Sequence, residues 1–408
     1  NYNTVVGDEA GTAITTGDSN TAVGYLALDA NITGSNNVAV GEGALSTEDA
    51  GGRSVAIGVN SLGQQNVDGN VYNTAVGHAA GNNVTTGVQN TLIGGLAGDA
   101  ITTAGGNTAL GYQAMSALTT GGGNTAVGHQ SMANGVVTGL HNTGLGDGSL
   151  LVLTSGAYNT GLGKDALAAN TTASSNVAIG IAALGANTTG AENVATGAFC
   201  LEANTTGAQN TAIGHRALDA NTSANNNTAV GFAALGANTT GTANTAVGGA
   251  AGDAITTGGY NTAVGQSSLT ALTTGGSNTA VGYAAGQGLT GASNFNVAIG
   301  DETMLIAGEK SYNTAVGSDA MRGITTGSAN VGVGYNSLAA LTTGTNNVAM
   351  GSGSLDANTT GGSNTAIGEN ALTTNTTASN NTAVGKSALQ DNTTGGDNAA
   401  YGYRAMEA

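Results

Sequence analysis

The sequence predicts an all-β fold, a parallel β-solenoid of about 24 coils, and three observations carry the prediction. A unit of 17 residues recurs along the 408-residue chain, most units begin with Asn-Thr-Ala-Val-Gly or a close variant, and the chain has 71 glycines and no proline. Residues 20–35 and 227–242, for example, are near copies of one another. Since 17 residues are too few for two helices and a turn, each unit fits one coil of short β-segments and tight turns.

The repeat begins at 24 places and shows no interruption. With the first Asn as position one, 20 of the 23 intervals are 17 residues long. The interval from Ser54 is 19 residues, and those from Asn124 and Asn278 are 18. No change in composition separates one part of the chain from another, so we expect residues 1–408 to form one continuous solenoid array without a second domain.

The first strand of each coil is expected at positions two to four, where Thr-Ala-Val favours β-structure. Gly follows at position five in every unit, and we expect it to end the strand where the backbone needs a positive φ or a close approach to the next coil. The structural turn glycines of this prediction are Gly24, Gly41, Gly77, Gly128, Gly214, Gly231, Gly248, Gly282 and Gly385.

A second short strand is expected at positions thirteen and fourteen, which are often Thr-Thr and are followed by another Gly. Both strands would pair in parallel with the same strands of the next coil. Like residues then stack in columns along the solenoid.

Asn at position one is expected to form such a column inside the turn, with each amide bonding to the coils above and below. A simple preference of Asn for turns is the alternative. The column is interrupted only at Ser54. The expected ladder includes Asn20, Asn37, Asn73, Asn124, Asn210, Asn227, Asn244, Asn278 and Asn381.

Positions three and four are neighbours in a strand, so they face opposite sides, yet both are apolar. A strand that is apolar on both sides is covered on both sides. We expect Ala at position three to fill a thin interior and position four to form an apolar seam against another chain or a covering layer. The same reasoning places Leu at position nine opposite the small residue at position eight. The seam residues are Val23, Val40, Val76, Val127, Ile213, Val230, Val247, Val281 and Val384.

Composition and charge narrow the function classes. The chain has 24 acidic and 7 basic residues, a net charge of −17, which argues against nucleic acid because phosphate binding needs clustered Lys and Arg. No apolar run is long enough for a membrane helix, so we expect no membrane insertion in this segment. The single Cys200 excludes an internal disulfide framework.

The consensus N-T-A-V-G-x-x-A-L-x-x-N-T-T-G resembles the repeats of phage tail-fibre-like proteins, which often end in a self-cleaving chaperone of the endosialidase type. Residues 37–41 (Asn-Val-Ala-Val-Gly) and 176–180 (Asn-Val-Ala-Ile-Gly) are more distantly similar to the head repeats of trimeric autotransporter adhesins, whose period is shorter. The resemblance implies a left-handed roll, a parallel homotrimer, and a place outside the cell on a cell surface or virion. Phage and bacterial origins both stay open.

Candidate sites are few. The four histidines, His78, His129, His141 and His215, are expected to be surface variation without a metal. We interpret the acids, among them Asp29, Asp165, Asp219 and Asp253, as too scattered for a calcium repeat. Cys200 falls in the small-residue column and is expected to be a buried structural thiol.

Three surface features allow functional alternatives. Asn-Thr-Thr at Asn187, Asn204 and Asn358 matches the glycosylation sequon. Columns of Thr on a flat β-face would suit an ice-binding surface, although plain β-propensity explains them as well. Tyr recurs at position six and just before position one, where it either contacts glycans or covers the edges of the apolar seam; we favour the second interpretation.

We therefore expect a non-enzymatic structural fibre shaft without cofactors, a rigid spacer that presents a binding tip. The alternative is a bacterial surface adhesin whose rod surface itself binds a cell-surface glycan or protein receptor. Ice binding is a minor third possibility.

Overall fold

The structure is a computed structural model that describes residues 2–407, which divide into two compact units, residues 2–206 and 207–407. Each unit is a parallel β-solenoid, and the described residues contain no helix. Together the units make about 23 turns with a 17-residue repeat. This count is one lower than the number of repeat starts because few residues follow the last start, Asn398.

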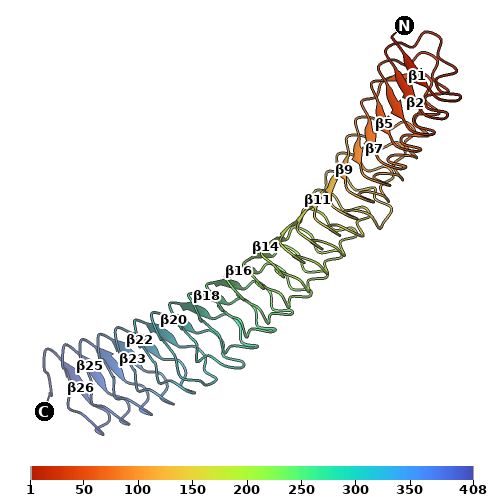
Figure 1. Ribbon diagram of the computed structural model, residues 1–408. Helices are drawn as coiled ribbons and strands as arrows, with labels where there is room; N and C mark the ends of the chain where they lie inside the picture. Colours follow the sequence, from red (N-terminus) through yellow and green to blue (C-terminus); the bar gives the residue numbers. More distant parts are fainter. Residues whose placement is uncertain (1, 408) are drawn as a thin grey trace. The chain divides into compact units, whose positions relative to one another are not determined.

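In the first unit, twelve three-residue strands stack in chain order (Figure 1). They are β1 (Thr4–Val6), β2 (Thr21–Val23), β3 (Val38–Val40), β5 (Val55–Ile57), β7 (Thr74–Val76), β8 (Thr91–Ile93), β9 (Thr108–Leu110), β10 (Thr125–Val127), β11 (Thr143–Leu145), β12 (Thr160–Leu162), β13 (Val177–Ile179) and β14 (Val194–Thr196). Each pairs in parallel with the next, and like positions face each other, as in Thr4↔Thr21.

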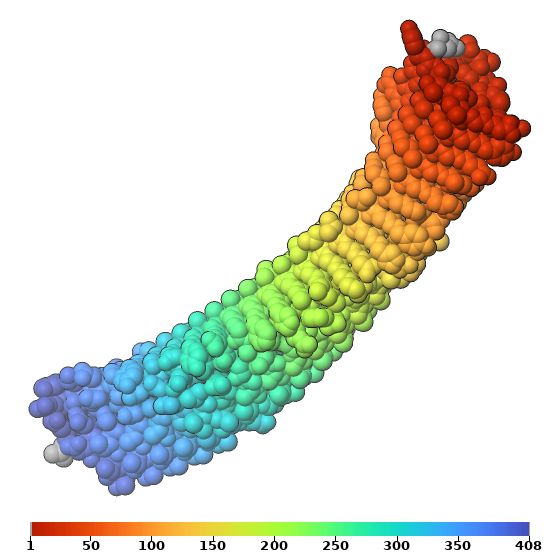
Figure 2. Space-filling model, in the orientation of Figure 1, coloured from red at the N-terminus to blue at the C-terminus, as the bar shows by residue number. Residues whose placement is uncertain are grey.

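The second unit repeats this arrangement with twelve strands, again in parallel and in register. They are β15 (Thr211–Ile213), β16 (Thr228–Val230), β17 (Thr245–Val247), β18 (Thr262–Val264), β19 (Thr279–Val281), β20 (Val297–Ile299), β21 (Thr314–Val316), β22 (Val331–Val333), β23 (Val348–Met350), β24 (Thr365–Ile367), β25 (Thr382–Val384) and β26 (Ala399–Tyr401). In the space-filling view, the colours within each unit follow one another as successive bands, so each coil lies against its chain neighbours (Figure 2).

The expected second strand at positions thirteen and fourteen is wrong for most coils, where the chain bends instead. The N–H groups of Thr239 and Thr240 both donate to one carbonyl, that of Thr256 in the next coil, at 2.9 and 3.3 Å. Two donors on one acceptor break the alternation of a β-ladder. Among the described residues only β4 (Gly51–Gly52) and β6 (Gly69–Asn70) form a second, two-stranded sheet.

The expected opposition of positions eight and nine is also wrong, because both side chains are buried. Ala234 and Leu235 are fully inaccessible to solvent, as are Ala27 and Leu28 in an earlier coil. The reason is a left-handed backbone at positions seven and nine, where Ala233 and Leu235 both have φ of 52°. Left-handed residues interrupt the strand alternation, so two successive side chains point into the core.

Two coil types fill the core differently. Five coils have Gly at position nine, and all five have Ile, Val or Leu three residues later. A Cβ on Gly252 would lie 3.1 Å from Cδ1 of Ile255, and one on Gly98 would lie 2.8 Å from Cδ1 of Ile101. In these coils the side chain at position twelve therefore packs closely against the Gly at position nine, whereas other coils bury a larger side chain at both positions, as with Met115 and Leu118.

Candidate functional surface

The outer side of the strands is the most regular surface of each unit. In the three-residue strands position three points inward, and Ala at this position is fully buried in nearly every coil. Positions two and four point outward and are half-buried or exposed; Ile213 and Val247 keep 42% and 38% of their area in contact with solvent. We call the outward residues at positions two and four the strand face.

The strand face holds the predicted seam residues. Val23, Val40, Val76, Val127, Ile213, Val230, Val247, Val281 and Val384 all lie at position four with outward side chains. None of the described strands contains Asp, Glu, Lys, Arg or His. In a chain with a net charge of −17, this face is a continuous uncharged stripe along each unit.

Aromatic side chains flank the strand face at position six, just after the strand, and at the last position of a coil, just before the next coil begins. Some pack in stacked pairs on neighbouring coils: Tyr112 with His129, His215 with Phe232, His141 with Tyr158, and Phe295 with Tyr312, with ring centroids 5.3–5.9 Å apart. The tyrosines at both positions are exposed. They stand at the edges of the strand face without covering it.

The Asn column at position one lies in the core. The nine ladder residues named above are all buried. Oδ1 of Asn20 accepts the backbone N–H of Asn37 at 2.9 Å, and Nδ2 of Asn37 donates to the carbonyl of Gly51, later in its own coil, at 2.8 Å. Direct amide-to-amide contacts are longer, as between Asn227 and Asn210 at 3.3 Å. The amide thus joins two coils and also closes its own.

The turn glycines lie at a position that excludes any other residue. Every Gly at position five has φ between 125° and 142°. A Cβ on Gly231 would lie 2.4 Å from the carbonyl oxygen of Gly248 in the next coil. Positive φ and close backbone approach therefore act together at this position.

A second Asn column at position twelve was missed as a structural feature and overturns the glycosylation alternative. Asn187, Asn204 and Asn358 are fully buried. Nδ2 of Asn187 donates to Oδ1 of Asn170 at 3.1 Å and to the carbonyl of Gly190 at 2.9 Å. A folded coil therefore has no room for a glycan on these amides. The recurrence of Asn at a fixed distance from the first column was the available signal.

The threonines of positions thirteen and fourteen lie on the bent segment. At position thirteen the hydroxyl donates to the next coil, as from Thr188 to the carbonyl of Thr205 at 3.0 Å. These residues therefore do not form the flat β-face that an ice-binding surface requires.

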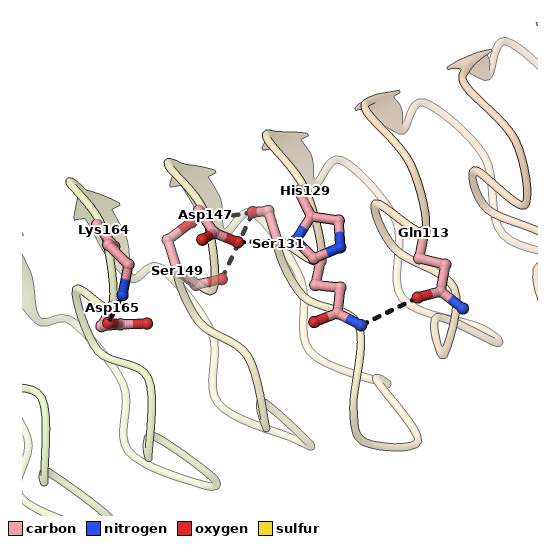
Figure 3. Close-up of polar contacts among 8 residues, drawn as sticks. Gln113, His129, Ser131, Asp147, Ser149, Lys164 and Asp165 are labelled. Atoms are coloured by element: carbon pink, nitrogen blue, oxygen red, sulfur yellow. Dashed lines mark hydrogen bonds and ion pairs between the residues drawn. The ribbon is translucent and has the colours of Figure 1, made fainter.

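A Ser, His and Asp lie close together in the first unit, but they do not form a catalytic triad (Figure 3). Nδ1 of His129 lies 2.9 Å from Oδ1 of Asp147, with both side chains about half exposed. Ser131 is buried, and its Oγ lies 2.9 Å from Oγ of Ser149. Positions six and eight project to opposite sides of the chain, so the hydroxyl and the imidazole face different environments.

No metal centre is formed by the described residues, since no three His, Cys, Asp or Glu side chains come together. The acids are nevertheless less scattered than expected. Asp29, Asp219 and Asp253 share position ten with Asp99 and Asp356, whereas Asp165 lies at position seven. These five coils are not neighbours, and burial raises the pKa of Asp99, Asp219, Asp253 and Asp356.

Three further titratable groups are buried. Cys200 is inaccessible in the small-residue column. Glu48 is buried at position twelve, and desolvation raises the pKa of its carboxyl, opposed by a hydrogen bond from Gln65. Lys310 takes the place of a small residue at position fifteen; its Nζ donates to the carbonyls of Ile306 and Ile324 at 2.7 Å, and burial lowers its pKa to about 8.

No protein-family model and no curated protein matches the chain. Within residues 2–407, no helix has the length and apolar character to cross a membrane.

Proposed function

We propose that the chain is a structural fibre shaft in which parallel copies associate through their strand faces. The observation that carries the proposal is the uncharged strand face, in which position two is mostly Thr and position four is an outward Val, Ile, Leu or Met in nearly every coil of both units. Leaving an apolar stripe in water costs about 25 cal/mol per Å², so covering it favours association. A net charge of −17 opposes contact elsewhere on the surface.

The copy number and handedness rest on the resemblance of the repeats to fibre and adhesin proteins. We propose three parallel copies, a left-handed roll, and an extracellular position on a virion or cell surface, where the shaft separates a binding tip from its base. In-register stacking supports stiffness within each unit, because its interior coils are held by backbone bonds to the coils on both sides.

The test is the mass of the protein in solution together with electron microscopy of single particles. We expect a trimer, and we expect the triple variant Val230→Lys, Val247→Lys, Val264→Lys to dissociate at a higher protein concentration than the wild type, with an unchanged circular dichroism spectrum. The triple variant Thr240→Lys, Thr257→Lys, Thr274→Lys, on the exposed bent segments of the same coils, is the matched control and leaves association unchanged. A monomeric wild type, or a strand-face variant that associates as strongly as the control, would contradict the proposal.

An adhesin is the second candidate, and the exposed aromatic columns beside the strand face favour it. The aromatic rings stay accessible at the edges when the strand face itself is covered. Binding of the isolated 408-residue chain to cells, lost in variants such as Tyr260→Ser and Tyr312→Ser, would support this role over that of a passive spacer.

A further inference from the structure

Several irregular features of the first unit lie at one place, the 19-residue coil that begins at Ser54. Here the Asn column is interrupted, and the extra sheet of β4 and β6 is formed. In this extra sheet Gly69 and Asn70 of the long coil pair with Gly51 and Gly52 of the preceding coil, directly before Arg53.

A shallow pocket of about 190 Å³ lies at this sheet. Its lining side chains are almost all polar: Thr33, Ser35, Asn36, Arg53 and Asn70, with the bare backbone of two glycines between them. The pocket therefore offers hydroxyl, amide and guanidinium groups from three successive coils, and no apolar recess that would hold a hydrophobic side chain.

Arg53 differs from the other basic residues that the structure describes. Lys164, Arg216, Arg322, Lys386 and Arg404 each lie within 4 Å of a carboxylate, and Lys310 is buried against carbonyls. Arg53 is exposed and forms none of these ion pairs. Its Nη1 donates to the hydroxyl of Tyr72 at 2.5 Å, and its guanidinium lies 5.6 Å from the centre of the Tyr72 ring. Tyr72 thus holds the guanidinium at the pocket without neutralising it.

We propose that this pocket binds a carboxylate-bearing sugar, such as a uronic acid unit of an acidic polysaccharide. The planar guanidinium pairs with a carboxylate through two parallel hydrogen bonds, a geometry that Lys cannot provide. The Thr, Ser and Asn groups match the hydroxyls of a sugar ring, and Tyr72 holds the guanidinium of Arg53 beside them. The acidic chain repels anions in general, so this local positive group gives the site its selectivity.

Asp68 allows a second test of the charge of the ligand, because it is an acidic residue that directly precedes the pocket residue Gly69. Its charge opposes an anionic ligand and would attract a cationic one. Asp68→Asn therefore tightens the binding of an acidic sugar and weakens the binding of a cation.

The experiment is titration of the full chain with digalacturonate, followed by amide chemical shifts and calorimetry. We expect the neutral digalactose to bind at least tenfold more weakly, Arg53→Gln to reduce digalacturonate affinity at least tenfold, and Arg53→Lys to recover only part of it. Arg216→Gln, which removes an ion-paired Arg in the other unit, is the control and leaves the affinity unchanged.

The proposal is overturned if neither sugar binds, if both bind equally, or if an Asp- and Glu-rich peptide binds as well as digalacturonate. Should Arg53→Gln unfold the coil, Tyr72→Phe tests the same point, since it removes only the hydroxyl that holds the guanidinium; a few-fold loss of affinity is expected. The copy number in solution does not enter this test, so its outcome is separate from that of the shaft proposal.

Discussion

A regular coil of the second unit, residues 227–243, and the long coil of the first unit, residues 54–72, satisfy their buried polar groups with different side chains. In the regular coil, the amide of Asn227 accepts from the N–H of Asn244 at 2.9 Å and donates to the carbonyl of Gly241 at 2.9 Å. In the long coil, position one is Ser54, whose side chain has no amide group.

Gln65, at position twelve, supplies the missing amide. Its Nε2 donates to Oγ of Ser54 at 3.0 Å and to Oε2 of Glu48 at 2.8 Å, and its Oε1 accepts from Nδ2 of Asn73 at 2.8 Å. The difference teaches that a buried amide at this level of the coil can be supplied by either of two positions, one or twelve.

The largest expected effect comes from a position that the two coils share. Gly231→Ala and Gly58→Ala each place a Cβ 2.4 Å from the carbonyl oxygen of the next coil, at φ of 136° and 134°. We expect each to cost more than about 5 kcal/mol of the unfolding free energy, since the blocked atom is backbone and cannot move aside. Denaturant unfolding of both variants measures this. A loss below about 1 kcal/mol in either coil would show that the coils can separate.

Substitution of the residue at position one should destabilise the regular coil more than the long coil. Asn227→Ala leaves the buried N–H of Asn244 without its acceptor, whereas the carbonyl of Gly241 keeps a second donor, Nδ2 of Asn238, at 3.0 Å. A buried unsatisfied group costs about 1–3 kcal/mol, so we expect a loss of about 3 kcal/mol of the unfolding free energy. Ser54→Ala should lose less than about 1 kcal/mol, because Gln65 keeps its bonds to Glu48 and Asn73. Urea midpoints of the two variants measure the difference. Equal losses would mean that Gln65 does not take over the role of the amide.

Lys310 marks a second irregular coil and predicts a dependence on pH. Its pKa is about 8 in the fold and ordinary, 10.5, when unfolded, so the unfolded chain binds more protons between these values. The unfolding free energy should therefore rise by about 3 kcal/mol as pH increases from 8 to 10.5. In Lys310→Met this rise should disappear, whereas the exposed Lys386→Met should keep it. A wild-type profile that matches that of Lys310→Met would contradict the burial of the amine.

The smallest effect is expected for Glu48→Gln in the long coil. The substitution removes a buried charge, which is favourable, but it also replaces one carboxylate oxygen by an amino group. Either the N–H of Gly51 or Nε2 of Gln65 then loses its acceptor, so the net change in the unfolding free energy should stay within about 1 kcal/mol. Since burial raises the pKa of Glu48, the wild type should gain stability as pH falls toward 4.5, and the variant should gain less. Thermal unfolding between pH 4 and 7 measures the difference. Parallel curves for the two proteins would show that Glu48 titrates normally.

The sequence was sufficient to predict the parts of the fold that depend on periodicity. The interval of 17, Gly at position five and alternation over three residues predict the parallel strands and the outward position of Val230 and its equivalents. Periodicity does not reveal a left-handed backbone at residues other than Gly, and Leu235 carries no local signature of its φ of 52°. Its inward side chain, and the bends in place of a second strand, follow from hydrogen bonds between coils.

The candidate sites were less predictable for a related reason. Asn187 matches a surface motif, yet the same amide is a core residue once its column is stacked. The pocket at Arg53 depends on a two-residue insertion that places Gly69 and Asn70 beside the preceding coil. A count of interval lengths locates the insertion but not the contacts that it creates.

The direction of the hydrogen bonds has a mechanical consequence. Within each unit the bonds between coils run along the stacking axis, so a pulling force applied along that axis stretches them directly. Under tension each unit should therefore unravel from an end, one coil at a time. Every step would release 17 residues, roughly 55 Å of extended chain. The stepwise release of equal lengths of chain would dissipate the energy of a sudden load before the remaining coils separate.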